Sequence, residues 1–302
     1  MTGTLTPLVL AGGALGFNWL PVFVAQRRGL FERHGLAVEL RRLGAVDKAT
    51  AAVNSGEAQL AISPPEGALA DAAVGGALRV VAANTNCLPL TLVARAGVQR
   101  IEDLKGAVLG TSSLTEGTAL YTQALLARHG LRYPQDYTFN VVGVHQARWQ
   151  ALQAGTIDAA LQPPPFNFLA IDAGYTDLGE VSNALPEIAF TALLGRTDWL
   201  AAHGPSVTAL LRAIGEATAV VCDPGHDDEV LPVMMEITQS DAHYGRRALD
   251  YMRRLGAFPR SFVIPEPALA TTLRLMVQAG LLAADAVDAA RAGVDLRWTR
   301  GA

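Results

Sequence analysis

The sequence predicts an α/β protein built from two similar lobes. The stretch AVNSGEAQLAISPP at residues 52–65 returns 99 positions later as ALQAGTIDAALQPP at 151–164. LFERHGL at 30–36 returns as LLARHGL at 125–131, at an offset of 95. Two echoes in the same order and at nearly equal offsets indicate an internal duplication. Short apolar runs also alternate with segments of helical periodicity, which is typical of a mostly parallel sheet flanked by helices.

Each copy of the longer repeat predicts the same local structure. A glycine, Gly56 or Gly155, ends a helix, because glycine fits the left-handed conformation found there. An acidic residue follows, Glu57 or Asp158, and then a short apolar run of the kind that forms a buried parallel strand. A Pro-Pro pair ends the strand, since proline cannot donate a ladder hydrogen bond.

The composition excludes several classes of protein. At 302 residues, 50% hydrophobic and 17% charged, the chain has enough apolar material for two folded lobes. The net charge of −4 and the scattered basic residues make nucleic acid an unexpected partner. Only two cysteines occur, without Cys-x-x-Cys spacing, so we expect no metal and no cofactor. The apolar run 7–25 contains Asn18, Trp19 and Pro21, which argues against a signal segment or a membrane span.

The first lobe begins with strand and helix in alternation. The expected strands are 8–11, 36–40, 59–62 and 78–83, and the expected helices are 19–33, 47–54 and 66–74. Asp47 is expected to cap the second of these helices, which runs to Asn54.

The alternation then restarts in a second lobe. Ser113 followed by Glu116 is a good match to a capping box for its first long helix. The expected strands are 107–110, 137–142, 159–161 and 176–179, and the expected helices are 101–106, 116–129, 146–154 and 166–173.

Two extended runs, 90–94 and 189–195, are expected to cross between the lobes and to form a hinge. From 198 to about 293 nearly everything is helical, and this tail is expected to return to the first lobe. The predicted lobes are therefore residues 1–89 plus 195–302, and residues 90–194.

Five phrases of the chain together resemble one known family. They are PVFVAQRRGLFERHGLAVEL (21–40), AVNSGEAQLAISPP (52–65), RVVAA (79–83), IEDLKGAVLGTSS (101–113) and LQAGTIDAALQPPP (152–165). They are similar to segments of the type II periplasmic binding proteins, in detail the branch that binds sulfonates, taurine, nitrate and thiamine precursors. The resemblance spans about residues 8–179. It implies a cleft between two lobes in which a small ligand is held, and closure about the hinge.

Loops at strand ends of the first lobe supply one half of the candidate site. Phe17, Asn18 and Trp19 follow the first strand, where the aromatic rings form a wall and the amide a donor, although they also suit a helix cap and core. Ser63, Pro64 and Glu66 follow the third strand, where the proline shapes the loop and the acid also favours a helix start. Asn84 and Asn86 end the fourth strand.

Loops of the second lobe supply the other half. Thr111, Ser112, Ser113 and Thr115 precede a helix and form a seat for an anion, unless they only cap it, and Glu116 beside them disfavours a strongly anionic ligand. Gln162, Phe166 and Asn167 offer amides and a ring for a neutral, amide-like or heterocyclic ligand. No Arg or Lys lies in these loops, which argues against a sulfonate or carboxylate held by a guanidinium, although Arg148 could swing in.

The resemblance implies a solute-binding protein of an ABC-type uptake system, monomeric, with a small-molecule ligand and an ABC permease as partner. It implies the periplasm if a leader has been removed, and the cytoplasm is the alternative. The family likeness also extends to a few enzymes, namely decarboxylases, a desulfinase and a pyrimidine-precursor synthase. The cysteine of the desulfinase-type relatives is replaced here by the Phe17 loop, and Cys87 with His145 is the remaining conceivable pair. A third alternative is a cytosolic metabolite sensor with an exposed apolar patch at 273–282.

Overall fold

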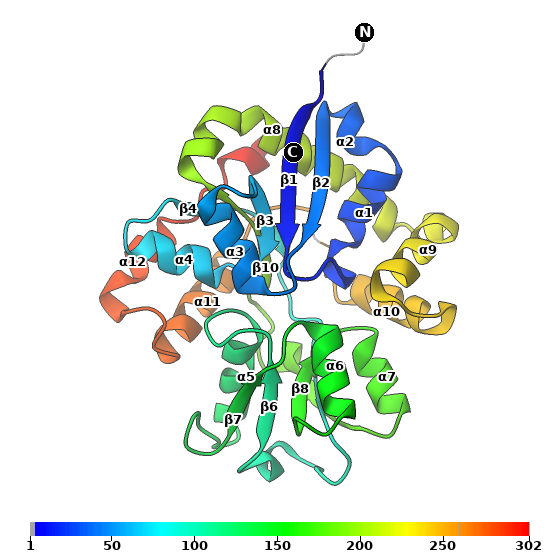
Figure 1. Ribbon diagram of the computed structural model, residues 1–302, viewed down its shortest axis with the longest axis vertical. Helices are drawn as coiled ribbons and strands as arrows, with labels where there is room; N and C mark the ends of the chain where they lie inside the picture. Colours follow the sequence, from blue (N-terminus) through cyan, green and yellow to red (C-terminus); the bar gives the residue numbers. More distant parts are fainter. Residues whose placement is uncertain (1–3, 259, 302) are drawn as a thin grey trace.

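Two five-stranded sheets form the centres of two lobes, one above the other, in the computed structural model, which describes residues 4–258 and 260–301 (Figure 1). The strand order is β2-β1-β3-β10-β4 in the first sheet and β7-β6-β8-β5-β9 in the second. One strand in each sheet, β10 or β5, is antiparallel to both of its neighbours. The predicted fold class, two α/β lobes with mostly parallel sheets, is confirmed.

The strands fall close to the apolar runs of the sequence. Those of the first sheet are β1 (Thr6–Gly12), β2 (Leu36–Arg42), β3 (Leu60–Ser63), β4 (Leu78–Thr85) and β10 (Thr191–Arg196). Those of the second sheet are β5 (Thr91–Ala94), β6 (Val108–Thr111), β7 (Thr138–Val141), β8 (Ala159–Gln162) and β9 (Thr176–Glu180). Strands β3, β5 and β8 are buried along their whole length, as expected for strands covered on both faces.

Helices cover the faces of both sheets. The first lobe has η1 (Phe17–Trp19), α1 (Leu20–Arg27), α2 (Leu30–Arg33), α3 (Val46–Ser55) and α4 (Glu66–Ala73). The second has η2 (Ile101–Leu104), α5 (Thr118–Ala127), α6 (His145–Gln153), α7 (Phe166–Asp172) and η3 (Val181–Asn183). The tail consists of α8 (Thr197–Cys222), η4 (Pro224–His226), α9 (Asp227–Thr238), α10 (Ala242–Arg254), α11 (Glu266–Gln278), η5 (Ala284–Ala286), α12 (Val287–Arg291) and η6 (Arg297–Gly301).

Three details of the predicted helices are wrong. The segment 19–33 is not one helix, because Gly29 adopts a φ of 62° and separates α1 from α2. Asp47 lies inside α3 and does not cap it, and the helix starts after Ala45 instead. The expected capping box also does not form, since α5 starts after Gly117 without a side-chain cap.

The duplicated stretches build the same joint in both lobes. Gly56 and Gly155 both have positive φ, 84° and 68°, and end α3 and α6 as predicted. One residue before each buried strand, β3 or β8, a side-chain oxygen accepts a hydrogen bond from a backbone N–H of the neighbouring parallel strand, β1 or β6. Gln59 Oε1 accepts from Val9 at 2.8 Å, and Asp158 Oδ2 accepts from Val108 at 2.8 Å. Gln59, and not Glu57, is therefore the counterpart of Asp158.

The chain crosses between the lobes twice, and the crossings lie beside one another. The runs predicted as crossings are the strands β5 and β10 themselves, and the crossings are the residues just before them, 86–90 and 184–190. The amide of Phe190 donates to the carbonyl of Thr85 at 3.0 Å, which bonds the second crossing to the end of β4. The division into residues 1–89 plus 195–302 and residues 90–194 stays a prediction, with β10 pairing in the first sheet from Thr191 onward.

The helical tail packs mainly on the first lobe, with α8 against α1 and α2, and α12 against α4. In Figure 1 the tail helix α10 also reaches down toward α7 of the second lobe. There Arg247 forms an ion pair with Asp172, and the Tyr244 hydroxyl donates to the same carboxylate at 3.1 Å. The segment 273–282 is not an exposed patch, because Leu273, Leu275, Met276 and Leu282 are buried.

Among the residues that the structure describes, one helix, α8, has the length and composition that a membrane span requires, and half of its apolar window is buried inside the protein. Pro205 lies within it, and His203 has non-helical backbone angles at a kink. It packs on the helices that cover the first sheet, as a core helix does.

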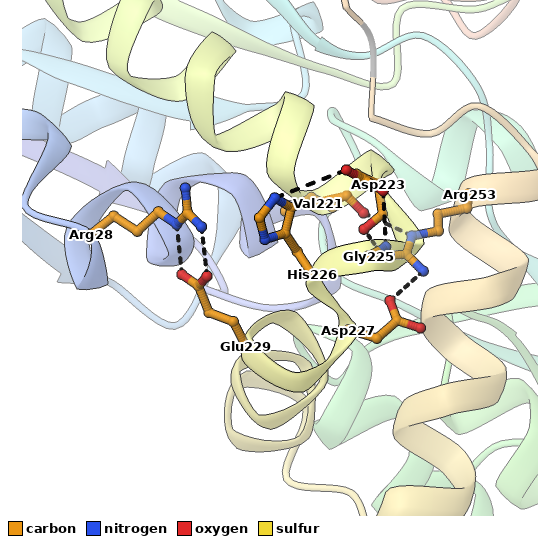
Figure 2. Close-up of polar contacts among 8 residues, drawn as sticks. All are labelled: Arg28, Val221, Asp223, Gly225, His226, Asp227, Glu229 and Arg253. Atoms are coloured by element: carbon orange, nitrogen blue, oxygen red, sulfur yellow. Dashed lines mark hydrogen bonds and ion pairs between the residues drawn. The ribbon is translucent and has the colours of Figure 1, made fainter.

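The turn between α8 and α9 is held by a polar network (Figure 2). Arg253 of α10 donates from Nε to the carbonyl of Val221 at 2.7 Å and pairs with Asp227 at 2.8 Å. On the far side of α9, Arg28 of the first lobe makes a bidentate pair with Glu229, with both distances 2.7 Å. These contacts join α8, α9, α10 and the first lobe into one body.

Candidate functional site

A cavity of about 70 Å³ lies between the two lobes. Its walls come from loops at the carboxyl ends of strands in both sheets, where open α/β sheets bind ligands. Residues of the first lobe in the lining include Gly13, Phe17, Asn18, Ser63 and Pro64. Residues of the second lobe include Ser112, Gly117, Thr118, His145 and Arg148, the crossings add Leu90 and Phe190, and the start of β10 adds Thr191.

Aromatic rings from both lobes surround the cavity. Phe17 stacks on Phe190 with ring centroids 6.3 Å apart, and Tyr121 of α5 meets Phe190 edge-on at 6.1 Å. The ring of His145 lies 5.8 Å from Phe17 and 5.5 Å from Phe166. Such walls bury an apolar or planar body and leave orientation to a few polar groups.

His145 of the second lobe inserts against the Gly-rich loop of the first. A Cβ atom added to Gly16 would lie 2.7 Å from both Cε1 and Nε2 of the imidazole, so only glycine leaves room for the ring. Burial lowers the pKa of His145 to about 3, and the positive charges of Arg148 and Arg42 add to the effect. The imidazole is therefore neutral and lies at the boundary between the lobes.

Of the described residues that line the cavity, Arg148 is the one with a charged side chain. It is only 4% exposed, and it donates from Nε to the carbonyl of Leu161 at 2.9 Å and from Nη1 to that of Gly143 at 3.3 Å. No carboxylate of the described residues forms an ion pair with it. Burial lowers its pKa to about 10, so the guanidinium keeps its charge at neutral pH. The result is a buried positive charge beside a cavity, held in place by neutral carbonyls.

Sequence reasoning considered His145 and Arg148 but did not choose them. Both belong to α6, which starts at the carboxyl end of β7, and three positions apart on a helix they share a face. That spacing, together with the position at the start of a helix, was the signal in the sequence that could have identified both as site residues. Phe190 and Thr191 were missed because they lie where the returning crossing meets β10, which no local pattern marks as part of a site.

Six of the predicted site residues line the cavity, namely Phe17, Asn18, Trp19, Ser63, Pro64 and Ser112. The amide of Asn18 donates to Thr191 Oγ1 at 3.3 Å. Asn84 lies behind it and donates to the same hydroxyl at 3.0 Å and to the carbonyl of Asn18 at 3.2 Å. Trp19 also fills the space over Gly12, so it belongs to the core as well as to the wall.

The predicted anion seat of the second lobe is a closed hydroxyl cluster. Thr118 Oγ1 lies 2.9 Å from Thr111 Oγ1 and 3.2 Å from Ser112 Oγ. Ser113 and Thr115 bond to each other at 3.3 Å, with Thr115 exposed to solvent. The cluster places Ser112 and Thr118 in the lining and keeps Thr111, Ser113 and Thr115 out of it.

The remaining predicted residues lie around the cavity and not in its lining. Asn86 donates to the carbonyl of Val263 at 3.1 Å and thus ties the first crossing to the tail. Asn167 donates to Thr91 Oγ1 at 3.2 Å, and the buried amide of Gln162 has no hydrogen-bond partner among the described residues. Phe166 lines a smaller neighbouring cavity beside His145.

Glu66 is not in the lining either. It accepts a hydrogen bond from the Tyr121 hydroxyl of the second lobe at 3.0 Å. Glu116 turns away from the hydroxyl cluster and accepts from Thr50 of the first lobe at 3.2 Å. The Glu116 carboxyl, which the sequence placed beside the anion seat, therefore lies in the contact between the two lobes.

Cys87 is outside the lining of the cavity, and burial raises the pKa of its thiol to about 12, so it is not a thiolate. The part of the chain that the structure describes has no group of three or more His, Cys, Asp or Glu side chains placed to hold a metal ion.

The architecture is that of the type II periplasmic binding proteins, two lobes joined by two crossings with the cavity between them. The sequence model described as NMT1/THI5 like matches residues 16–225, and the chain belongs to this family.

Solved structures share the whole fold at low sequence identity. A protein from Bordetella bronchiseptica is 23% identical, with a TM-score of 0.85 and coverage of 98% of this chain and 96% of that one. The alkanesulfonate-binding protein SsuA from Xanthomonas axonopodis, solved with MOPS, is 17% identical, with a TM-score of 0.77 and coverage of 97% and 99%. The periplasmic nitrate-binding protein NrtA from Synechocystis is 13% identical, with a TM-score of 0.77 and coverage of 97% and 86%.

A curated relative is the bicarbonate transport ATP-binding protein CmpC from Synechocystis, 30% identical over 236 residues. The match covers 70% of this chain and 34% of the relative, so the chain spans about a third of that protein's length. The class predicted from the sequence, a binding protein of this fold, agrees with the family and with these structural relatives.

Proposed function

We propose that the chain is the solute-binding component of an ABC-type import system and that its cleft closes on a small organic anion. The fold and the family support the first part, together with the names of the relatives. Export to the periplasm and docking to a permease belong to the same proposal.

The buried side chain of Arg148 is the observation that supports an anionic ligand. A buried guanidinium beside a cavity, with no carboxylate partner among the described residues, is costly unless the ligand supplies the opposite charge. The sequence prediction disfavoured such a ligand because the site loops lack arginine. Arg148 belongs instead to α6, and its fixed backbone partners orient it without any swing.

The rest of the lining selects the body of the ligand. The rings of Phe17 and Phe190 suit a planar or apolar group, and Asn18 and Ser112 add neutral polar contacts. A carboxylate or sulfonate on a small aromatic or alkyl body fits both parts. A neutral pyrimidine, which the sequence left open, leaves the charge of Arg148 without a partner.

The test is a thermal-shift and calorimetry panel of matched pairs, namely benzoate with benzamide, benzenesulfonate with benzenesulfonamide, and an aminopyrimidine. A specific ligand at about 100 times its dissociation constant stabilises the protein by about 2.7 kcal/mol. We expect the anion of a pair to bind and its neutral partner to fail.

Two variants locate the charge. Arg148→Met removes a charge-assisted contact of about 1.5–3 kcal/mol, so affinity for the anion falls about tenfold to a hundredfold. Arg132→Met, an exposed arginine of the same lobe, is the matched control and leaves affinity unchanged. Equal binding of benzoate and benzamide, or of benzoate by both variants, contradicts the proposal.

A further inference from the structure

Two buried carboxyl groups join the lobes beside the cavity. Glu66 starts α4 in the first lobe, and Glu116 precedes α5 in the second. Each is bonded to the opposite lobe, Glu66 to the hydroxyl of Tyr121 at 3.0 Å and Glu116 to that of Thr50 at 3.2 Å. We call these four residues the carboxyl latch.

The latch is closely fitted. A Cβ atom added to Gly67 would lie 2.3 Å from Glu116 Oε1, so the Glu116 carboxyl occupies the space that a side chain on α4 would need. A Cβ atom added to Gly117 would come within 3.3 Å of Pro64 Cγ. Pro64 and Gly117 both line the cavity, so the latch brings two opposite walls of the cavity into contact.

The latch has no counter-charge. Glu66 is 1% exposed and Glu116 is 5% exposed, and neither forms an ion pair with a described Lys, Arg or His. The charged neighbours that act on Glu116 have the same sign, namely the Glu66 carboxyl and Asp47 of α3. Two carboxylates without a cation are unfavourable in such a place, and protonation removes the cost.

The proton affinities of the two groups agree with this geometry. Burial raises the pKa of Glu66 to about 7, although hydrogen bonds from backbone amides and Tyr121 oppose the effect. Burial, followed by the charge of Glu66, raises the pKa of Glu116 to about 8. When the lobes separate, Tyr121 and Thr50 leave these carboxyls and water replaces them, which returns both groups toward ordinary behaviour.

We propose that Glu66 and Glu116 are positioning residues that join the cavity walls only while the pair carries protons, so that closure of the lobes takes up protons from solvent. The proposal rests on the proposed function in one respect, because closure is the motion that encloses the solute. The two carboxyls act through the walls they join and do not line the cavity themselves.

The sign of the pH dependence follows from linkage. Groups whose pKa is raised in the closed form favour closure fully below their open-form pKa, near 4.3, and this advantage is lost as pH rises through about 7 and 8. His145 acts oppositely, because its lowered pKa makes closure release a proton below its ordinary value of about 6.5. Between pH 7 and 9 His145 is neutral in both the open and the closed form. Arg148 stays positively charged and Tyr121 stays neutral over the same range, so only the two carboxyls of the latch titrate. This window isolates the latch.

The experiment is small-angle X-ray scattering of the protein without added solute, from pH 7 to pH 9, with the radius of gyration as the readout. The variant is Glu66→Gln with Glu116→Gln, which keeps the shape and removes the titration. Glu57→Gln, an exposed acid of the first lobe, is the control. Titration of glutamate labelled with carbon-13 at Cδ, followed by NMR, reports the same two groups directly.

We expect the wild-type protein and the control to expand as pH rises, with the closed-to-open ratio falling about twentyfold between pH 7 and 9. The double variant stays compact throughout. Identical profiles for wild type and double variant at every pH overturn the proposal, as does a carbon-13 titration in which every glutamate changes near pH 4.5. Since no solute is added, this outcome is independent of the test of Arg148, and either proposal can fail alone.

Discussion

The imidazole of His145, on the second lobe, occupies the space in which a side chain at position 16 of the first lobe would lie, 2.7 Å from its Cβ. The contact exists only when the lobes are together. Gly16 has extended backbone angles that alanine also adopts, so its absence of a side chain matters for the neighbour and not for the local backbone.

Gly16→Ala is therefore expected to oppose closure. Overpacking of this kind costs about 1–3 kcal/mol, so affinity for a bound anion falls about tenfold to a hundredfold while thermal stability without the anion changes little. Calorimetry and thermal unfolding measure the two quantities. Gly215→Ala is the control, because its new Cβ meets Phe262 at an ordinary 3.5 Å. Combining Gly16→Ala with His145→Ala restores binding, and failure of that rescue refutes the steric explanation.

His145 is expected to stay neutral in the closed protein. Burial and two arginine charges lower its pKa to about 3, so nitrogen-15 shifts of its ring remain constant from pH 8 to pH 5 when an anion is bound. In Gly16→Ala the ring titrates near its ordinary value of about 6.5. Because closure lowers this pKa, the contribution of His145 to the closed form decreases as pH falls below about 6.5, in the direction opposite to the carboxyl latch, and His145→Gln removes only that contribution. A bound-state titration near pH 6.5 contradicts this account.

Gln59 and Asp158 are expected to contribute alike at neutral pH and differently in acid. Alanine at either position leaves a partly buried strand N–H unpaired and destabilises the protein by about 1–3 kcal/mol in urea unfolding. Burial acts to raise the pKa of Asp158, but the Val108 amide and Arg95 outweigh it and lower the value. The contribution of Asp158 is therefore present above pH 4 and is lost as pH falls below it, whereas that of Gln59 is constant. Equal loss of both at pH 3 contradicts the prediction.

Arg253 is expected to be the main support of the joint between α8 and α9 (Figure 2). Its side chain is mostly buried and bonds Val221 and Asp227, so Arg253→Ala destabilises the protein by about 1–3 kcal/mol. Arg28→Ala removes the exposed bidentate pair with Glu229, which belongs to α9 as Asp227 does, and costs at most about 1 kcal/mol. Urea unfolding compares them, and neither variant changes anion affinity. A larger loss from Arg28→Ala reverses the ranking and rejects the prediction.

Local signals in the sequence were enough to predict the lobes. Glycine at a helix end has a backbone requirement that few other residues meet, which is why Gly56 and Gly155 marked the duplication correctly. The break at Gly29 was missed, because a glycine within a helical pattern is usually tolerated and its φ of 62° depends on how α2 packs. The hydrogen bond from Val9 to Gln59 spans 50 residues, so no local pattern reveals it.

The site was harder to predict, because its charged residue is defined by what surrounds it. Arg148 looks like an ordinary surface residue of a helix until the second sheet and the first lobe enclose it. Glu116 presented the opposite difficulty, since Ser113 three positions earlier suggested a helix cap while the carboxyl in fact bonds Thr50, 66 residues away. Tertiary contacts outweighed local preference in both cases.

The position of β10 has a consequence for synthesis of the chain. This strand lies between β3 and β4, at the interior of the first sheet, yet it follows the whole second lobe in the sequence. On the ribosome β1 to β4 emerge early and must wait for residue 196, while β5 to β9 emerge as an unbroken series. The second lobe, although it follows the first four strands in the sequence, is thus the first whose sheet can be completed. Until β10 is synthesised, the edges of β3 and β4 that it will pair with stay open and need protection from other chains.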